Sequence, residues 1–406
     1  MRRLLVIIGI EAYAVLLAFY RGLGAVHTDE AKYLLDIPYP HPPLARTIIN
    51  LTESIPQQEM LWRIIFATLL VQAVWLVERM AKKLSPEDRL TLCGLWIFSA
   101  SVMFQSGTIM MAVLTALQGV VFVWLLLKDS PASLRYAETS RHSSAERNDA
   151  GWIALFWLVS LFTAYQAVLY LPIVVAIFWR AKVHPVRIAL AIGVPLLLLV
   201  MYVASNPLAA ASFVAAGEQN VGQPLVDLLQ ITLRSWLWAG GIVLSIAGLL
   251  GMIRSKHWPL ILSFLLVCAF HVTSYRVYYP VLFLPLLVGG VVVYPKVLRK
   301  SAVLLAMQII IATYIFAHSE LAFYETGART VMRQVNQLHS GEVVLIAGSF
   351  GHSWQYESRS PVLRYRPSLL SKAKAVVCLE DCPGVSGYGF YQIENIPQEV
   401  WIRKEK

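Results

Sequence analysis

Residues Leu4–Gly22 read LLVIIGIEAYAVLLAFYRG, an apolar run long enough to cross a bilayer as a single helix. The apolar part ends at Arg21 without a small-residue cleavage pattern, so the run is not a cleavable signal. Ten further apolar runs follow along the chain. The eleven candidate membrane spans are residues 4–22, 61–78, 90–106, 108–127, 151–164, 167–179, 188–205, 233–252, 258–274, 277–294 and 301–318.

The overall composition agrees with this pattern. Of the 406 residues, 57% are hydrophobic and only 14% are charged, whereas a soluble domain usually carries about 25% charged residues. These values exclude an ordinary soluble enzyme, a disordered chain and a coiled coil. The net charge of +10 needs no nucleic-acid partner, because excess Lys and Arg on a membrane protein reports its orientation.

The distribution of Lys and Arg predicts the topology. We separate 151–164 from 167–179 because one helix over both would be about 44 Å long, too long for a hydrocarbon core of about 30 Å. With the N-terminus in the cytoplasm, the cytoplasmic segments hold 18 Lys and Arg and the opposite loops hold 6. This bias favours a cytoplasmic N-terminus, and eleven spans then place the C-terminal tail outside.

The sequence therefore predicts an α-helical polytopic membrane protein with about 11 transmembrane helices and a small C-terminal extracytoplasmic α/β domain. The expected domains are 1–318, whose outer loop 23–60 carries an Asp-Glu motif, and 319–406. In the tail, residues 342–347 and 374–379 have strand character. One helix face repeats at intervals of three and four residues, through Tyr324, Ala328, Val331, Val335 and Leu338.

Two smaller features of the tail leave alternatives open. Gly348–Gly351, after the first strand, is either a plain turn or an anion cradle, and two glycines alone favour the turn. Cys378 and Cys382 lie close together and can form a disulfide if the tail faces an oxidising compartment. Cys93 and Cys268, in contrast, lie inside apolar runs as small hydrophobic residues.

Chemistry on the outer side needs a carboxylate from a short set. Before the tail, the expected outer loops offer Asp29, Glu30, Asp36, Glu53, Glu59, Glu218 and Asp227. The densest stretch is His27–Leu44, HTDEAKYLLDIPYPHPPL. We expect Thr28 to cap a helical turn over Asp29–Asp36, with Asp29 and Tyr33 on one face. His41 lies between two prolines, which restrict its backbone. The alternative is a solvated loop whose acids only favour a helix N-terminus.

This stretch resembles the first outer loop of the GT-C glycosyltransferases, in particular the branch of protein O-mannosyltransferases and aminoarabinose transferases. The resemblance rests on Asp29-Glu30, Tyr33 and His41-Pro-Pro-Leu44, and on a later patch, Tyr275–Leu286, which reads YRVYYPVLFLPL. Many relatives carry a second acidic residue in the loop before the fourth span. Here residues 105–108 read QSGT and contain no carboxylate.

The resemblance implies transfer of a sugar from a polyprenyl-phosphate donor to an acceptor hydroxyl at the outer membrane surface, with inversion. The acceptor would be a lipid, a glycan or a protein, and membrane lipid surrounds the enzyme. Asp29 and Glu30 would be the catalytic residues, and the same two would bind a divalent cation, Mg or Mn. Substrate would contact a wider set of side chains: Tyr33, His41, Arg276, Tyr278, Tyr279, Arg234 and Lys32.

Two other functions stay open at this point. A transporter or flippase for a lipid-linked sugar would carry charges at mid-membrane and inverted repeats. Here Glu11 is the acid that falls deep inside a span, and no repeat is visible. An inactive relative acting as an assembly subunit is compatible with the missing second acid. The expected location is a bacterial inner or plasma membrane, with the N-terminus cytoplasmic and the C-terminal domain extracytoplasmic.

Overall fold

The computed structural model describes residues 2–37, 42–128, 145–208, 210–211, 214, 222–274, 276–298, 301–318, 326–338, 342–381, 385, 390–393 and 399–403. The chain forms two compact units. The first contains residues 1–18, 38–48 and 62–319, and the second contains 19–37, 49–61 and 320–406. The segments 19–37 and 49–61, which we grouped with the transmembrane domain from the sequence, thus belong to the same unit as the tail.

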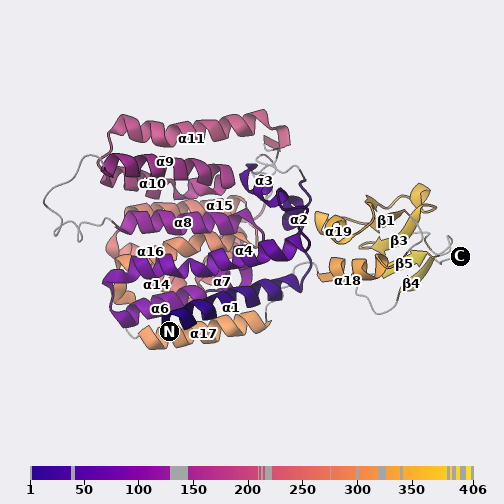
Figure 1. Cartoon of the computed structure of the whole chain (residues 1–406), viewed down its shortest axis with the longest axis horizontal. Coiled ribbons are helices and arrows are strands. Elements are labelled where there is room, and N and C mark those ends of the chain that lie inside the picture. The colour runs from indigo at the N-terminus through magenta and orange to yellow at the C-terminus, as the bar shows by residue number, and fades with distance from the viewer. Residues whose placement is uncertain are drawn as a thin grey trace. The chain divides into compact units, whose positions relative to one another are not determined.

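The first unit is a bundle in which most of the long apolar helices run side by side (Figure 1). Its elements, some of which extend into the second unit at their ends, are α1 (Arg2–Gly22), α3 (Leu44–Asn50), α4 (Gln58–Gln72), α5 (Val74–Met80), η1 (Ala81–Lys83), α6 (Pro86–Ile97), α7 (Ala100–Gln105), α8 (Met111–Lys128), α9 (Ala145–Thr163), η3 (Tyr165–Tyr170), α10 (Leu171–Arg180), α11 (Pro185–Ser205), α13 (Leu225–Gly240), α14 (Val243–Ser255), α15 (Trp258–Thr273), η4 (Tyr279–Phe283), α16 (Leu284–Val293), η5 (Pro295–Leu298) and α17 (Ser301–His318).

These helices confirm a polytopic helical membrane protein. Each of the eleven apolar runs is helical over most of its length. Within the described ranges, four helices are long and apolar enough to span a membrane alone, or five if one bent pair counts as a single span. The expected break between the fifth and sixth runs is present, because α9 ends at Thr163 and η3 begins at Tyr165.

The run 233–252 is not the straight span that the sequence indicated. Helices α13 and α14 meet there at 103°. The corner is Gly241 and Ile242, both with positive φ, of +71° and +68°. On α17, Gln308 donates from Nε2 to the carbonyl oxygen of Gly240 at 2.7 Å and to that of Phe98, after α6, at 2.9 Å. One buried amide thus satisfies carbonyls freed at two helix ends, which apolar surroundings require.

Glu11, the acid inside the first helix, also has an internal partner. The side-chain amide of Gln72 on α4 donates a hydrogen bond to its carboxylate. A paired carboxylate inside a span agrees with a structural role for this residue, as its depth in the run indicates.

The second unit combines a small sheet with short helices. Its strands are β1 (Val343–Ala347), β2 (Val362–Arg364), β3 (Ala373–Cys378), β4 (Phe390–Ile393) and β5 (Glu399–Arg403), in the order β2-β1-β3-β5-β4. The pairs of β1 with β2 and β3 are parallel, and those of β5 with β3 and β4 are antiparallel. Its helices are α2 (Thr28–Leu34), α18 (Thr326–Val335), α19 (His352–Glu357) and η7 (Pro367–Leu369).

The α/β character of the tail was predictable, but only in part. The expected helix corresponds to α18, and the two expected strands correspond to β1 and β3. Three further strands and α19 carried no signal that we recognised. Gly348 (φ +101°) lies in a turn, and a Cβ there would approach the side chain of Glu380. A nearby carboxylate favours the plain turn over an anion cradle. Cys378 is disulfide-bonded, while its expected partner Cys382 lies outside the described residues.

Candidate functional site

The acidic motif lies on α2, a helix of seven residues. Its N-cap is His27, not Thr28 as the sequence indicated. The Nδ1 atom of His27 accepts a hydrogen bond from the backbone N–H of Asp29 at 3.2 Å, and the backbone N–H of His27 donates to Oε2 of Glu30 at 2.8 Å. These reciprocal bonds satisfy N–H groups that a helix start leaves without an intrahelical partner. The helix ends at Leu34, and Asp36, with φ of +51°, lies beyond it.

One face of α2 is closed by a buried ion pair. Glu30 has no solvent exposure, and its Oε2 lies 2.9 Å from a guanidinium nitrogen of Arg21, which is 2% exposed. Arg21 also donates to the carbonyl oxygen of Ala25. The pair joins the end of α1 to the start of α2 across a short connection. Removing either charge would leave the other buried without its partner.

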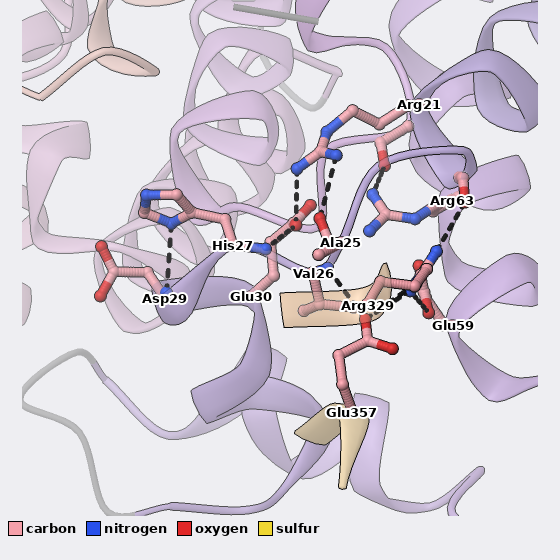
Figure 2. A network of polar contacts seen from close by, with 12 residues as sticks. Arg21, Ala25, Val26, His27, Asp29, Glu30, Glu59, Arg63, Arg329 and Glu357 are labelled. Carbon is pink, nitrogen blue, oxygen red and sulfur yellow. Dashed lines mark hydrogen bonds and ion pairs between the residues drawn. The ribbon is translucent and has the colours of Figure 1, made fainter. Parts of the chain in front are cut away.

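The other acid of the motif has a different environment. The side chain of Asp29 points away from the Arg21–Glu30 pair (Figure 2). Its Oδ1 lies 2.8 Å from Nζ of Lys32, and the two side chains are 11% and 19% exposed. Tyr33, four residues along the same helix, is 2% exposed. Asp29 is therefore held in place yet reachable, whereas Glu30 is sealed.

A second network fixes the backbone just before α2 (Figure 2). Arg329 on α18 donates to the carbonyl oxygen of Gly22 at 2.6 Å, to Glu59 at 2.6 Å and to Glu357 at 2.9 Å. Glu357 also accepts from the backbone N–H of Val26 at 3.3 Å. Burial lowers the pKa of Arg329, but its bonds and ion pairs with Glu357 and Glu59 more than offset this and raise it. We call Arg329, Glu59 and Glu357 the Arg329 clamp.

Close packing supports the clamp. A Cβ at Gly351, the N-cap of α19, would lie 1.9 Å from Oγ1 of Thr28, the first residue of α2. Only glycine lets the two helix starts approach so closely. The tail of the chain thus touches the acidic motif directly, which the sequence did not predict. Arg329 and Glu357 are ordinary charged residues of the tail, and no spacing relates them to residues about three hundred positions earlier.

The remaining carboxylates are less suited to the same role. Glu59 belongs to the Arg329 clamp. Asp36, Glu53 and Asp227 are exposed, and Glu218 lies outside the described residues. Among the acids that the structure describes in these loops, Asp29 and Glu59 both combine a fixed position with partial access, of 11% and 15% of the side chain, but the cation of Glu59 is shared with Glu357.

The late patch belongs to the first unit. Arg276 is exposed, and its carbonyl oxygen accepts from the backbone N–H of Tyr279 at 3.0 Å. Tyr278 and Tyr279 are 5% and 4% exposed, with ring centroids 4.9 Å apart. The hydroxyl of Tyr279 accepts from Gln166 at 3.3 Å. Both tyrosines therefore form a packed base for the turn that carries Arg276. Arg234, also a predicted site residue, is exposed on α13.

Two further site predictions concern the substrate contact of His41 and the divalent cation. His41 lies outside the described residues. For the expected divalent cation, no group of three His, Cys, Asp or Glu side chains gathers anywhere in the described segments. Asp29 and Glu30, its expected ligands, are each already paired with a cationic side chain. A metal there would have to displace Lys32 or Arg21, so the residues present do not fit one well.

An apolar helical bundle followed by a small α/β region makes this chain a polytopic membrane protein, and the same fold occurs in a solved structure. The likeness is to the crystal structure of ArnT from Cupriavidus metallidurans bound to undecaprenyl phosphate, with a TM-score of 0.64 over 97% of both chains and 12% identity. The oligosaccharyltransferase of Archaeoglobus fulgidus, in complex with Zn and sulfate, has a TM-score of 0.48 over 91% of this chain and 67% of that one, with 11% identity. No family model and no curated protein matches the sequence.

Proposed function

We propose that this protein is an integral-membrane glycosyltransferase that moves a sugar from a polyprenyl-phosphate donor to an acceptor hydroxyl, with inversion at the anomeric carbon. The observation that carries the proposal is Asp29, a fixed and partly accessible carboxylate on a helix that begins six residues after α1 ends. The reactive carbon of a lipid-linked sugar lies at headgroup depth. A catalytic group close to the end of an apolar helix is in the right zone for it.

In the proposed reaction, Asp29 is the general base. The acceptor oxygen attacks the anomeric carbon, and the hydroxyl proton moves to the Asp29 carboxylate. The bond between the anomeric carbon and the phosphate oxygen breaks, and polyprenyl phosphate leaves with the electron pair. Lys32, 2.8 Å from Asp29, holds the carboxylate in position, and Tyr33 is buried four residues further along the same helix. No step in this proposal passes through a metal.

Glu30 has a positioning role in this mechanism. Its carboxylate is occupied by Arg21 and by the backbone of His27, so it sets the start of α2 and thereby the direction of Asp29. Preorganisation of this kind is valuable because small displacements of a catalytic group cost large factors in rate. The direct catalytic and metal-binding roles first expected for Glu30 stay predictions.

Arg276 is proposed to bind the phosphate of the donor. Its guanidinium is exposed on a turn that two buried tyrosines support, and a guanidinium can bind two phosphate oxygens at once. Positive charge at the leaving phosphate stabilises the transition state. Arg234 is a second cation available to the donor, and His41 remains a candidate for substrate contact.

The likeness to ArnT supports the general class of the reaction. That protein was crystallised with undecaprenyl phosphate, a carrier of the proposed type. At 12% identity the likeness concerns the fold, so the sugar and the acceptor have to be found by experiment. We infer a lipid, glycan or protein acceptor in the cell envelope.

A direct test is binding of the leaving group. Native mass spectrometry of the purified protein with polyprenyl phosphate should show a complex, and polyprenol without phosphate should compete poorly. In cells, deletion of the gene should remove one glycan modification, and Asp29→Asn should fail to restore it. If the protein were a flippase, Asp29→Asn would restore the modification, because transport of a lipid-linked sugar does not need a general base. Full restoration by Asp29→Asn would support the flippase or the assembly subunit.

The proposed orientation, with the N-terminus cytoplasmic and the tail outside a bacterial plasma membrane, is testable by cysteine labelling. Ser54 and Ser371 are exposed residues of the second unit, and Lys182 is an exposed residue after α10. In intact cells an impermeant maleimide should label Ser54→Cys and Ser371→Cys, and it should label Lys182→Cys only after lysis. Labelling of Lys182→Cys alone would reverse the orientation.

A further inference from the structure

The first unit contains a cavity of about 650 Å³ that the proposed transfer reaction does not use. It lies where α5, α8, α10, α14 and α16 end and α15 begins. The end of α8 lies at the same end of the bundle as the start of α1 (Figure 1), so this is the end at which α1 begins. Its size falls within the range of sites for small organic ligands.

The cavity is lined by basic residues from three different parts of the chain. They are Arg79, Lys82, Lys83, Lys128 and Arg180. No carboxylate belongs to its described lining. Glu78, next to Arg79 in sequence, is 3.9 Å from Arg89 instead. Five exposed cationic residues therefore line one hollow whose described lining contains no carboxylate, and the positive potential that they create favours an anionic ligand.

Parts of this lining are held rigidly. Arg180 donates to the carbonyl oxygen of Leu126 at 2.6 Å, and its other terminal nitrogen lies 3.3 Å from Nε2 of His257. Burial, and then the charge of Arg180, lower the pKa of His257 to about 4. The imidazole is thus neutral near pH 7 and accepts from Arg180. The ammonium of Lys128 lies 5.4 Å from the centre of the Trp124 ring.

The rest of the lining is apolar. Leu84, Trp124, Leu127, Val292 and Val293 lie along the same cavity. A soluble anion would gain nothing from these walls, whereas a phospholipid presents a charged phosphate together with the start of its acyl chains. Basic pockets between transmembrane helices are suited to such headgroups.

We propose that this cavity binds the phosphate headgroup of an anionic phospholipid, at the end of the helix bundle where α1 begins. Lys83, Arg79 and Lys128 contact the phosphate oxygens, and Arg180 is the fixed wall of the site. Trp124 and the valines take the apolar part of the lipid. This site is separate from the donor site and requires no sugar.

The test is native mass spectrometry of the full chain, released from micelles containing phosphatidylglycerol or phosphatidylcholine. The pocket variant is Arg79→Gln/Lys83→Gln/Lys128→Gln. The control variant, Lys182→Gln/Arg187→Gln/Arg254→Gln, removes the same charge from exposed residues at the same end of the bundle, outside the cavity. We expect the pocket variant to lose roughly tenfold or more in phosphatidylglycerol affinity, since each cation near an anionic lipid contributes measurably. The control should lose less than about threefold, by the same principle.

Each other outcome has a definite meaning. Equal losses in both variants would overturn the proposal, because they would show diffuse attraction to the surface. Equal retention of phosphatidylcholine and phosphatidylglycerol would overturn it as well. If inorganic phosphate alone displaced the lipid at millimolar concentration, the source of the phosphate would be soluble, and the lipid assignment would be wrong. Should the triple variant fail to fold, Lys83→Glu, a change at one exposed residue, must show the same selective loss.

Discussion

The two faces of α2 carry neighbouring carboxylates with opposite surroundings. Glu30 is fully buried against Arg21, while Asp29 is bound to Lys32 and keeps 11% of its side chain exposed. Both are acids of the same motif, and the sequence gives no means of ranking them. The difference teaches that environment assigns the roles: a sealed pair holds the backbone, and an open pair is available to substrate.

The largest expected effect on turnover comes from Asp29, on the accessible face of α2. Asp29→Asn keeps the shape of the side chain but removes proton acceptance at neutral pH, so transfer should fall by roughly 10²–10⁴-fold. The measurement is turnover of purified protein in lipid, with thermal stability as the control. If turnover stayed close to that of the unaltered protein, the base would have to be sought elsewhere, beginning with Asp36.

A change outside both faces should come next. Arg276→Ala should lower turnover by about 10²-fold, the size seen when one transition-state donor is removed. Arg276→Lys should recover only part of this, because an ammonium does not reproduce the planar fork of a guanidinium. An arginine with a purely structural role would behave differently: Lys would substitute well, and Ala would lower protein yield rather than polyprenyl-phosphate binding.

Substitution of Glu30, on the closed face of α2, should lower the stability of the protein more than its turnover. Glu30→Gln leaves Arg21 as a buried charge without its anion, which typically costs about 3–5 kcal/mol. We expect a lower melting temperature and yield. Because Gln at this position can still accept from the backbone N–H of His27 and keep the start of α2 in place, turnover per folded molecule should stay within about tenfold of normal. The double variant Arg21→Met/Glu30→Leu should recover much of the stability. A selective loss of turnover in a stable Glu30→Gln protein would give Glu30 a chemical role and blur the contrast between the faces.

The smallest effect should come from the Arg329 clamp. Arg329→Gln leaves Glu59 and Glu357 without their shared cation, so we expect a several-fold loss of turnover and a modest fall in melting temperature. Arg333→Gln is the matched control, since Arg333 is exposed on the same helix, α18. The rate of limited proteolysis in the segment before α2 is a second measurement for the two variants. Equal behaviour of the two variants would mean that the clamp does not position the acidic motif.

How well the sequence predicted each feature depends on how far apart along the chain the interacting residues lie. Apolar runs report helices directly, because burial in lipid depends on the local composition of each segment. The bend between α13 and α14 was missed because the run stays apolar through the corner, and its stabilising amide, Gln308, comes from a distant helix. Strands β4 and β5 are only 4 and 5 residues long, and β4 pairs with β5 at the edge of the described sheet, so their own sequence patterns are weak.

The candidate site shows the same limit. Asp29, Glu30 and Tyr33 were identifiable because they lie within one turn of one another. Their ranking was not, because it depends on Arg21, Arg329 and Glu357. Of these, Arg21 is close in sequence, and its position at the end of α1 was a usable signal that we read only as orientation. Pairing with Glu357 has no local signature in either segment.

The hydrogen bond between the backbone N–H of Val26 and Glu357 also limits when α2 can be fixed during synthesis of the chain. These residues are 331 positions apart. At ordinary synthesis rates of about 5–20 residues per second, the ribosome needs roughly 17–66 seconds to make the chain between them. During that interval α2 exists without its partner from the tail. A nascent chain therefore carries the acidic motif without this hydrogen bond until the segment around Glu357 has been synthesised.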